Sequence, residues 1–159
     1  MRKSKWTLYC FCQSAYNVYR FIFRKGMFAV LKTGIVGKAE VQVAAEHTAR
    51  VMKSGELEVF ATPAMVALAE EAACRSVAPY LNEGETTVGT LVQLEHLAAT
   101  PVGMLVSAES RLIELDGRRL VFEICVRDQR GEVGRGRHER FIVRSDRFLK
   151  KAQERNAAG

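Results

Sequence analysis

The feature that most constrains this chain is a single helix-forming run followed by four strand-like runs with no helix between them. The run from about Pro63 to Leu81 is rich in small apolar residues, and Thr62 before Pro63 is a typical N-cap and first-turn pair. Gly84 follows as a stop signal. The four strand-like runs occupy residues 86–99, 102–115, 118–128 and 131–144. Parallel strands would need crossover connections, so this order predicts an α+β protein with an antiparallel sheet.

The connections between these runs predict a meander. Turn residues at 100–103 ("TPVG"), 116–117 ("DG") and 129–131 ("QRG") are typical of hairpins. A short alternating strand, "KAEVQVAA", comes before the helix, and residues 46–59 form a polar connecting or lid segment. We expect the sheet to wrap around the one long helix. Its open edges favour pairing with a second copy of the chain.

The net charge of +6 arises from the first 26 residues. Residues 1–26 hold six Lys and Arg and no acid, whereas residues 27–159 hold 18 basic and 18 acidic residues. A nucleic-acid surface belongs on the folded body, so nucleic acid is not an expected partner. We expect residues 1–26 to be a basic, aromatic leader that is disordered or not native. Residues 27–148 then form one domain, and residues 149–159 a charged tail with about one helical turn near 146.

The leader has an alternative role at a membrane surface. Its apolar stretch is interrupted by polar residues, so stable membrane insertion is not expected. The four cysteines, Cys10, Cys12, Cys74 and Cys125, form no CxxC pair and no zinc-type cluster with histidine. This pattern favours a reduced, cytoplasmic protein without a metal.

Two adjacent carboxylates, Glu70 and Glu71, interrupt the apolar helix. At 100° per residue, Glu70 lies beside Val66 and Val77 at the edge of the apolar stripe, while Glu71 lies on the opposite side. Apolar neighbours destabilise a carboxylate as an anion, which suits it to general-base or nucleophilic chemistry. Geometry supports equally well an outward-pointing Glu70 that pairs with an arginine of the sheet.

Thr62 and His96 each have a structural and a functional interpretation. An N-cap threonine needs no further role, yet a helix N-terminus offers free N–H groups that can stabilise an oxyanion. On a strand, His96 shares a face with Val92 and Leu94, where a histidine is more often a satisfied core residue. Gly89 in the same strand indicates a bulge or a close backbone approach.

His138 and Arg140 alternate onto one face of the last strand. A solvated strand near a sheet edge is the simpler interpretation, and a cation facing a phosphate or carboxylate is the functional one. The neighbouring glycines Gly131, Gly134 and Gly136 do not form a phosphate loop, because no strand–loop–helix context surrounds them.

Together these features resemble the hotdog fold of acyl-CoA thioesterases, and more narrowly the fluoroacetyl-CoA thioesterase-like family. The resemblance rests on "VFATPAMVALAEEAACRSVAPYLNEGETTVGTLVQLEHLAATPVG" and "GRGRHERFIV", and it runs without an evident gap from about Val59 to Arg144. It implies a hotdog domain that forms a homodimer, or a tetramer built from that dimer.

The resemblance also implies roles for five residues. Thr62, Glu70 and His96 match the family's catalytic hydroxyl, glutamate and histidine in type and spacing, and are expected to meet in a cleft at the dimer interface. Gly89 matches the glycine whose backbone approaches the thioester and pantetheine arm. Arg140 matches a basic position of the last strand, and we expect both residues to bind substrate.

The implied function is hydrolysis of an acyl-CoA thioester to free acid and CoA, with Glu70 as base or nucleophile. CoA is part of the substrate, so no separate cofactor is expected. The fluoroacetyl-specific enzyme carries phenylalanines in a longer connection before the helix, whereas residues 48–59 here contain no aromatic residue. A small or medium acyl group is therefore expected. The alternative is a non-catalytic hotdog dimer that binds an acyl-CoA or a related thioester.

Overall fold

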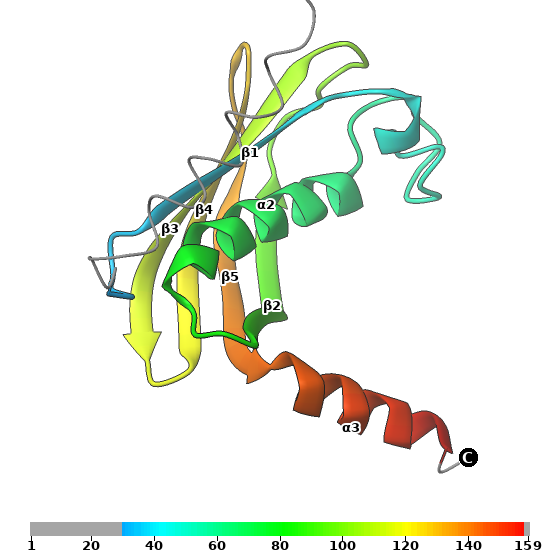
Figure 1. The fold of residues 1–159 in the computed structure, drawn as a ribbon. Helices are drawn as coiled ribbons and strands as arrows, with labels where there is room; N and C mark the ends of the chain where they lie inside the picture. Colours follow the sequence, from blue (N-terminus) through cyan, green and yellow to red (C-terminus); the bar gives the residue numbers. More distant parts are fainter. Residues whose placement is uncertain (1–29, 158–159) are drawn as a thin grey trace, which may run out of the picture.

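The computed structural model describes residues 30–157, so the expected leader at 1–26 lies outside the described residues. Five antiparallel strands form one sheet in the order β1-β3-β4-β5-β2, and the helix α2 lies across its concave face (Figure 1). The expected architecture, one long helix wrapped by an antiparallel sheet, is confirmed. The elements in chain order are β1 (Val36–Gln42), η1 (Ala45–His47), α2 (Thr62–Val77), η2 (Ala78–Tyr80), β2 (Glu85–His96), β3 (Leu105–Asp116), β4 (Arg119–Asp128), β5 (Gly131–Arg144) and α3 (Ser145–Ala157).

Helix α2 differs from the expected one at both ends. Its N-cap is Ala61, which makes no side-chain hydrogen bond, and Thr62 is the first helical residue. The prediction of Thr62 as the N-cap is therefore wrong, and its hydroxyl is available to another partner. The helix ends at Val77, earlier than expected, because Pro79 has no N–H with which to continue the helical hydrogen bonds.

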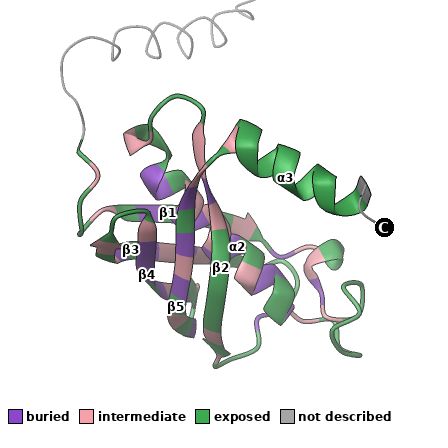
Figure 2. Ribbon diagram, turned by 90° about the horizontal axis from the view of Figure 1, so that it is seen from below, coloured by how far each residue is buried: buried purple, intermediate pink, exposed green. Residues whose placement is uncertain are grey.

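Helix α2 is buried on one face (Figure 2). This face consists mainly of small side chains, which let the helix lie close to the sheet. The approach is tight at Gly37 of β1, where an added Cβ would collide with the carbonyl oxygen of Ala72 and the side chain of Ser76. On the sheet side, Leu112 and Phe122 are completely buried against this layer. The buried residues of α2 are Ala64, Met65, Leu68, Ala69, Ala72, Ala73, Ser76 and Val77.

One of the three expected hairpins is wrong. Strand β2 pairs with β5, and β3 pairs with β1 and β4, so the chain crosses the sheet between β2 and β3 instead of folding back at 100–103. The turn does form, but the Gly103 N–H donates to the Val43 carbonyl and ties it to the end of β1. Turn residues in a sequence indicate where the chain changes direction. They do not indicate which strand the next segment pairs with. The hairpins at 116–117 and 129–131 are confirmed.

The C-terminal segment forms a longer helix than the single expected turn. Helix α3 begins at Ser145, whose N–H donates to the carbonyl of Gly84, and it projects past the β2 edge of the sheet (Figure 1). Asp146 in its first turn complements the helix dipole. Neither α3 nor any other helix within residues 30–157 is long and apolar enough to cross a membrane.

Gly37→Ala should destabilise the fold, because the added methyl group has no room between β1 and α2. We expect the free energy of unfolding in urea to fall by about 1–3 kcal/mol. Gly55→Ala is the matched control: its Cβ would lie 3.4 Å from that of Ala49, and its effect should stay below about 1 kcal/mol. Equal effects at the two positions would show that the contact at Gly37 does not limit the packing.

Candidate active site

Glu70 lies midway along α2 and reaches over the sheet to strand β5. Its Oε1 atom is 3.5 Å from Nε2 of His138 and 3.5 Å from Nη1 of Arg140, and its side chain stays 39% exposed. Gly89 of β2 lies directly beneath, where an added Cβ would overlap Oε1. The register of β2 and β5 shifts just after Gly89, so the expected bulge and close approach are both present. Glu70 is therefore packed on a glycine and faces two cationic or polar side chains.

Arg140 is nearly completely buried and makes three hydrogen bonds. Nε donates to Oγ1 of Thr87 at 2.8 Å, and Nη2 donates to the Thr87 carbonyl at 2.8 Å. Nη1 donates to Nε2 of His138 at 3.0 Å and also faces Glu70. The guanidinium is fixed on three sides, and Glu70 supplies the opposite charge. The pairing of Glu70 with an arginine of the sheet, expected as one of two alternatives, is thus present in the structure.

His138 is completely buried beneath Glu70, so the expectation of a solvated strand near an edge is wrong for this residue. Strand β5 lies between β4 and β2, and α2 covers it. Nδ1 of His138 donates to the Leu91 carbonyl at 2.9 Å, which leaves Nε2 without a proton as the acceptor for Arg140. Burial lowers the pKa of His138, the Arg140 cation lowers it further, and the Leu91 carbonyl and Glu70 oppose this. His138 is neutral in this arrangement.

Thr62 and His96 form a second pair, where the first residue of α2 meets the last residue of β2. Oγ1 of Thr62 lies 2.9 Å from Nδ1 of His96. Nε2 of His96 is shielded from solvent and has no hydrogen-bond partner among the described residues. The pair borders an open hollow of about 340 Å³, whose lining also includes Val59 and the segment 97–99. This histidine is oriented by the threonine hydroxyl and has one unused nitrogen.

The five residues singled out from the sequence therefore fall into two groups. Thr62 contacts His96, whereas Glu70 contacts Gly89 and Arg140. The two groups are about 12 Å apart along the helix axis, at 1.5 Å rise per residue. The meeting of Thr62, Glu70 and His96 at a dimer interface stays a prediction.

Sequence reasoning missed Thr87, and it named His138 without assigning it to the Glu70 group. Arg140 hydrogen-bonds both of them. The alternation of His138 with Arg140 on one strand face was the available signal. It pointed to the wrong environment because the position of β5 inside the sheet depends on its non-local pairing with β2.

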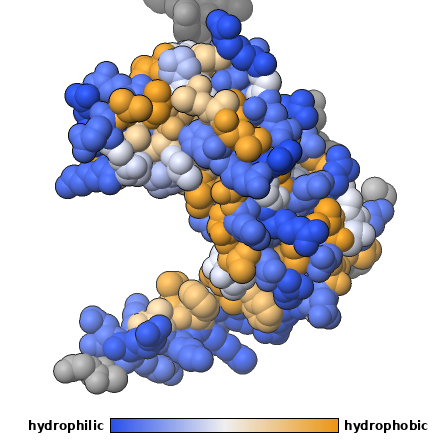
Figure 3. Space-filling view, turned by 180° about the vertical axis from the view of Figure 1, so that it is seen from behind, coloured by the Kyte–Doolittle hydropathy of each residue, from blue (hydrophilic) through white to orange (hydrophobic). Residues whose placement is uncertain are grey.

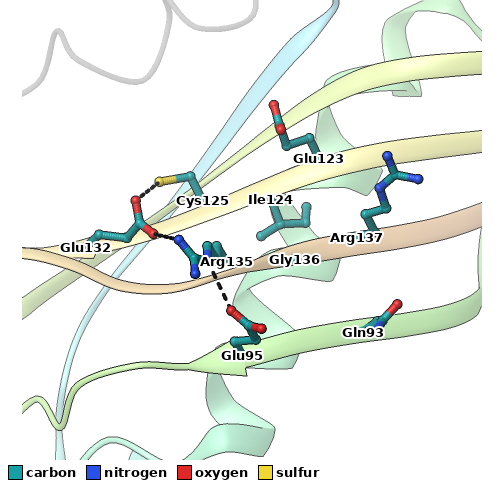
Figure 4. Close-up of a pocket in the computed structure, with 9 residues that line it drawn as sticks. All are labelled: Gln93, Glu95, Glu123, Ile124, Cys125, Glu132, Arg135, Gly136 and Arg137. Carbon is teal, nitrogen blue, oxygen red and sulfur yellow. Dashed lines mark hydrogen bonds and ion pairs between the residues drawn. The ribbon is translucent and has the colours of Figure 1, made fainter.

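A separate cavity of about 450 Å³ lies on the sheet face turned away from α2 (Figure 4). Arg135 there pairs with Glu95 at 3.0 Å and with Glu132 at 3.8 Å, and the Cys125 thiol lies 3.7 Å from Glu132. These exposed charges compensate one another, and none of them contacts Glu70. Within residues 30–157 no three His, Cys, Asp or Glu side chains gather as metal ligands would. The Glu70 and Thr62 groups are therefore the candidate active site.

Solved structures of other proteins share this fold. The fluoroacetyl-CoA thioesterase FlK is similar with a TM-score of 0.74 and 35% identity, over 78% of this chain and 96% of that one. A thioesterase superfamily member from Thermus thermophilus is similar with a TM-score of 0.74 and 29% identity, over 82% of this chain and 99% of that one. The fold is the hotdog fold of the thioesterase superfamily, as expected.

Sequence comparison identifies the family. The profile of the fluoroacetyl-CoA-specific thioesterase family matches residues 43–146. The fluoroacetyl-CoA thioesterase of Streptantibioticus cattleyicolor is 41% identical over 102 residues, which make up 64% of this chain and 73% of that protein. The chain belongs to the fluoroacetyl-CoA-specific thioesterase family, and the resemblance noted in its sequence is confirmed.

Neutral, buried His138 should make the protein less stable in acid. Its pKa in the folded state lies below the unfolded value of 6.5, so the unfolded chain binds the extra proton first. The free energy of unfolding is unaffected by His138 above about pH 6.5 and falls as the pH drops below it, by up to about 1.4 kcal/mol per pH unit. Melting temperatures between about pH 7.5 and pH 5 measure this slope. His138→Gln should flatten it, and an unchanged slope in that variant would contradict the assignment.

Proposed function

We propose that the protein hydrolyses a small or medium acyl-CoA thioester to the free acid and CoA, with Glu70 as the central catalytic residue. Membership of the family supports thioester hydrolysis, and the relative from Streptantibioticus cattleyicolor is named for fluoroacetyl-CoA. The observation that carries the proposal is the placement of Glu70. It is held against Gly89 and Arg140 yet stays accessible from outside.

The environment of Glu70 suits a base or a nucleophile. His138 and Arg140 both face Oε1, and no described residue hydrogen-bonds Oε2. As a base, Glu70 removes a proton from water while the water oxygen attacks the thioester carbon. The C–S bond then breaks, and the CoA thiolate takes up the proton that Glu70 removed, which restores the carboxylate. As a nucleophile, the carboxylate attacks the same carbon, releases the thiolate and forms an anhydride that water hydrolyses.

Because Thr62 and Glu70 are about 12 Å apart in one chain, the Thr62–His96 pair supports the reaction only across the dimer proposed below, beside the partner subunit's Glu70. The free N–H groups of the first helical turn can stabilise negative charge on the thioester oxygen. The hydroxyl of Thr62 orients His96, whose unused Nε2 can hold or pass a proton. Tight binding of acyl-CoA without thiol release would instead identify a non-catalytic binding protein.

The same proposal includes a cytoplasmic homodimer paired along β2. This strand is at one edge of the sheet, and its side chains Leu91 and Val92 are 47% and 36% exposed near its middle. An unpaired edge with exposed apolar side chains is a natural surface for a second copy. Such a dimer places a second set of site residues beside the first.

Glu70→Gln should abolish thioester hydrolysis, because an amide is neither a base nor a nucleophile. Thiol release from a panel of short, medium and long acyl-CoAs, fluoroacetyl-CoA included, should fall by about 10²–10⁴-fold for every active substrate. Glu71→Gln is the matched control: this neighbouring carboxylate pairs with Arg75 on the helix surface. Its activity should equal that of the wild type. Unchanged turnover in a folded Glu70→Gln protein would refute the assignment.

Thr62→Val should lower kcat by about 10–100-fold through loss of the hydroxyl that orients His96. Thr62→Ser keeps the hydroxyl and should restore most of the rate. Steady-state kinetics on the best substrate of the panel provide the comparison. Equal losses in the valine and serine variants would mean that packing, and not the hydrogen bond, matters at this position.

A further inference from the structure

Helix α3 stands away from the body of the protein and bounds an open notch beside β2. Figure 3 shows α3 on one side of this notch and the segment between β1 and α2 on the other. Phe148 and Leu149 of α3 remain 45% and 59% exposed. The helix packs on its own protomer only near its start, against β5. Most of α3 therefore has no covering layer within the described chain.

The apolar side chains of α3 gather on one side of the helix, which is typical of a helix that packs against another surface. At 100° per residue, Phe148, Leu149 and Ala152 share one side, while Lys150 and Glu154 lie on the other. Isolated helices of this length are marginal in water, and most helical stability comes from packing an apolar face. The pattern therefore favours a partner for the Phe148 face.

We propose that α3 is an arm that packs on a second copy of this chain and covers the hollow beside the partner subunit's Thr62–His96 pair. The inference rests on the proposed pairing of two copies along β2. The notch beside β2 is the space that the second copy occupies, and α3 extends past that edge (Figure 1).

Two-fold symmetry directs α3 to this hollow. A two-fold axis at the middle of β2 makes the two edge strands antiparallel. With the axis beside Leu91, residues equidistant from it, such as Glu85 and the partner subunit's Leu97, lie opposite each other. Since Ser145 is hydrogen-bonded to Gly84, α3 begins next to Glu85. The arm therefore leaves its own protomer beside the partner subunit's Leu97, which lines the hollow.

The surfaces brought together in this way are both apolar. Leu97 is 48% exposed at the hollow, and Leu57 in the segment before α2 is 67% exposed. In the proposed dimer, the exposed Phe148 and Leu149 of α3 pack against these apolar side chains of the second copy. Helix α3 is about 20 Å long, enough to lie across the hollow. Closing the hollow removes bulk water around the thioester, apart from the water that reacts, and so strengthens the electrostatic contacts within the site.

Disulfide cross-linking between copies tests the contact directly. Full-length Leu97→Cys protein is mixed with full-length Leu149→Cys protein and oxidised, and each variant alone serves as the control for the native cysteines. We expect a covalent dimer in the mixture well above the level in either control. This readout does not depend on turnover, so it reports on α3 even if the proposed hydrolysis fails.

Kinetics test whether the arm closes the site. Phe148→Gln combined with Leu149→Gln should lower kcat/KM by about tenfold, because the partner's hollow stays open. Lys150→Gln combined with Glu154→Gln is the control: this exposed pair lies on the opposite side of α3, and the change leaves the net charge unaltered. The control should have wild-type activity.

Sedimentation of the wild-type protein measures whether it is a monomer or a dimer. Together with the cross-linking and the kinetics, this distinguishes the following outcomes. A dimer that cross-links, and whose kcat/KM depends on the Phe148 face, supports the proposal. A dimer that neither cross-links nor loses activity in the Phe148–Leu149 variant overturns the role of α3 and leaves the thioesterase proposal intact. A monomer that hydrolyses acyl-CoA overturns both the pairing along β2 and the arm.

Discussion

The close contact between α2 and the sheet is the constraint on which the rest of the structure depends. Small side chains on α2, together with Gly37 on β1, bring the helix near enough for Glu70 to rest on the backbone of Gly89. A helix held farther from the sheet would carry the carboxylate away from Arg140. Close packing of protein interiors transmits such shifts instead of absorbing them. The hydrophobic core therefore sets the geometry of the site.

The buried guanidinium of Arg140 explains why its neighbours are the residues they are. A buried cation is costly unless its donors are satisfied and an opposite charge is near. Thr87 and His138 accept its hydrogen bonds, and Glu70 provides the negative charge. Neutral His138 suits this position because a protonated ring would add a second positive charge and remove an acceptor. Glu70 is thus a structural partner as well as the proposed catalytic group, so the two interpretations of its position are compatible.

Much of the fold could be predicted from the sequence because its signals are local. Apolar periodicity located α2 and the long strands, and the turns at 116–117 and 129–131 are short-range features. The pairing of β2 with β5 could not be predicted in this way, since it joins strands that are separated by two others along the chain. The burial of His138 follows from that pairing. The alternation of His138 and Arg140 onto one strand face therefore could not distinguish a buried histidine from a solvated one.

For the candidate site, the sequence indicated residues but not the contacts between them. Family resemblance singled out Thr62, Glu70, His96, Gly89 and Arg140, and all five lie along the contact of α2 with β2 and β5. The contacts among these residues depend on the distance of α2 from β2 and β5. A sequence pattern does not contain that distance. The hydroxyl of Thr62 illustrates this: a local signal indicated a cap, whereas the fold uses it to hold a histidine.

Strand β2 carries Gly89 and His96 toward α2, while the outer side of its backbone forms the edge of the sheet. In the proposed dimer, one short strand would therefore contribute both to the candidate site and to the contact between the two copies. Thermodynamic linkage makes these two contributions reciprocal: a ligand that binds more tightly to the paired strand strengthens the pairing by the same factor. In the proposed dimer, binding of the substrate and pairing of the two copies would therefore share one coupling free energy along this strand.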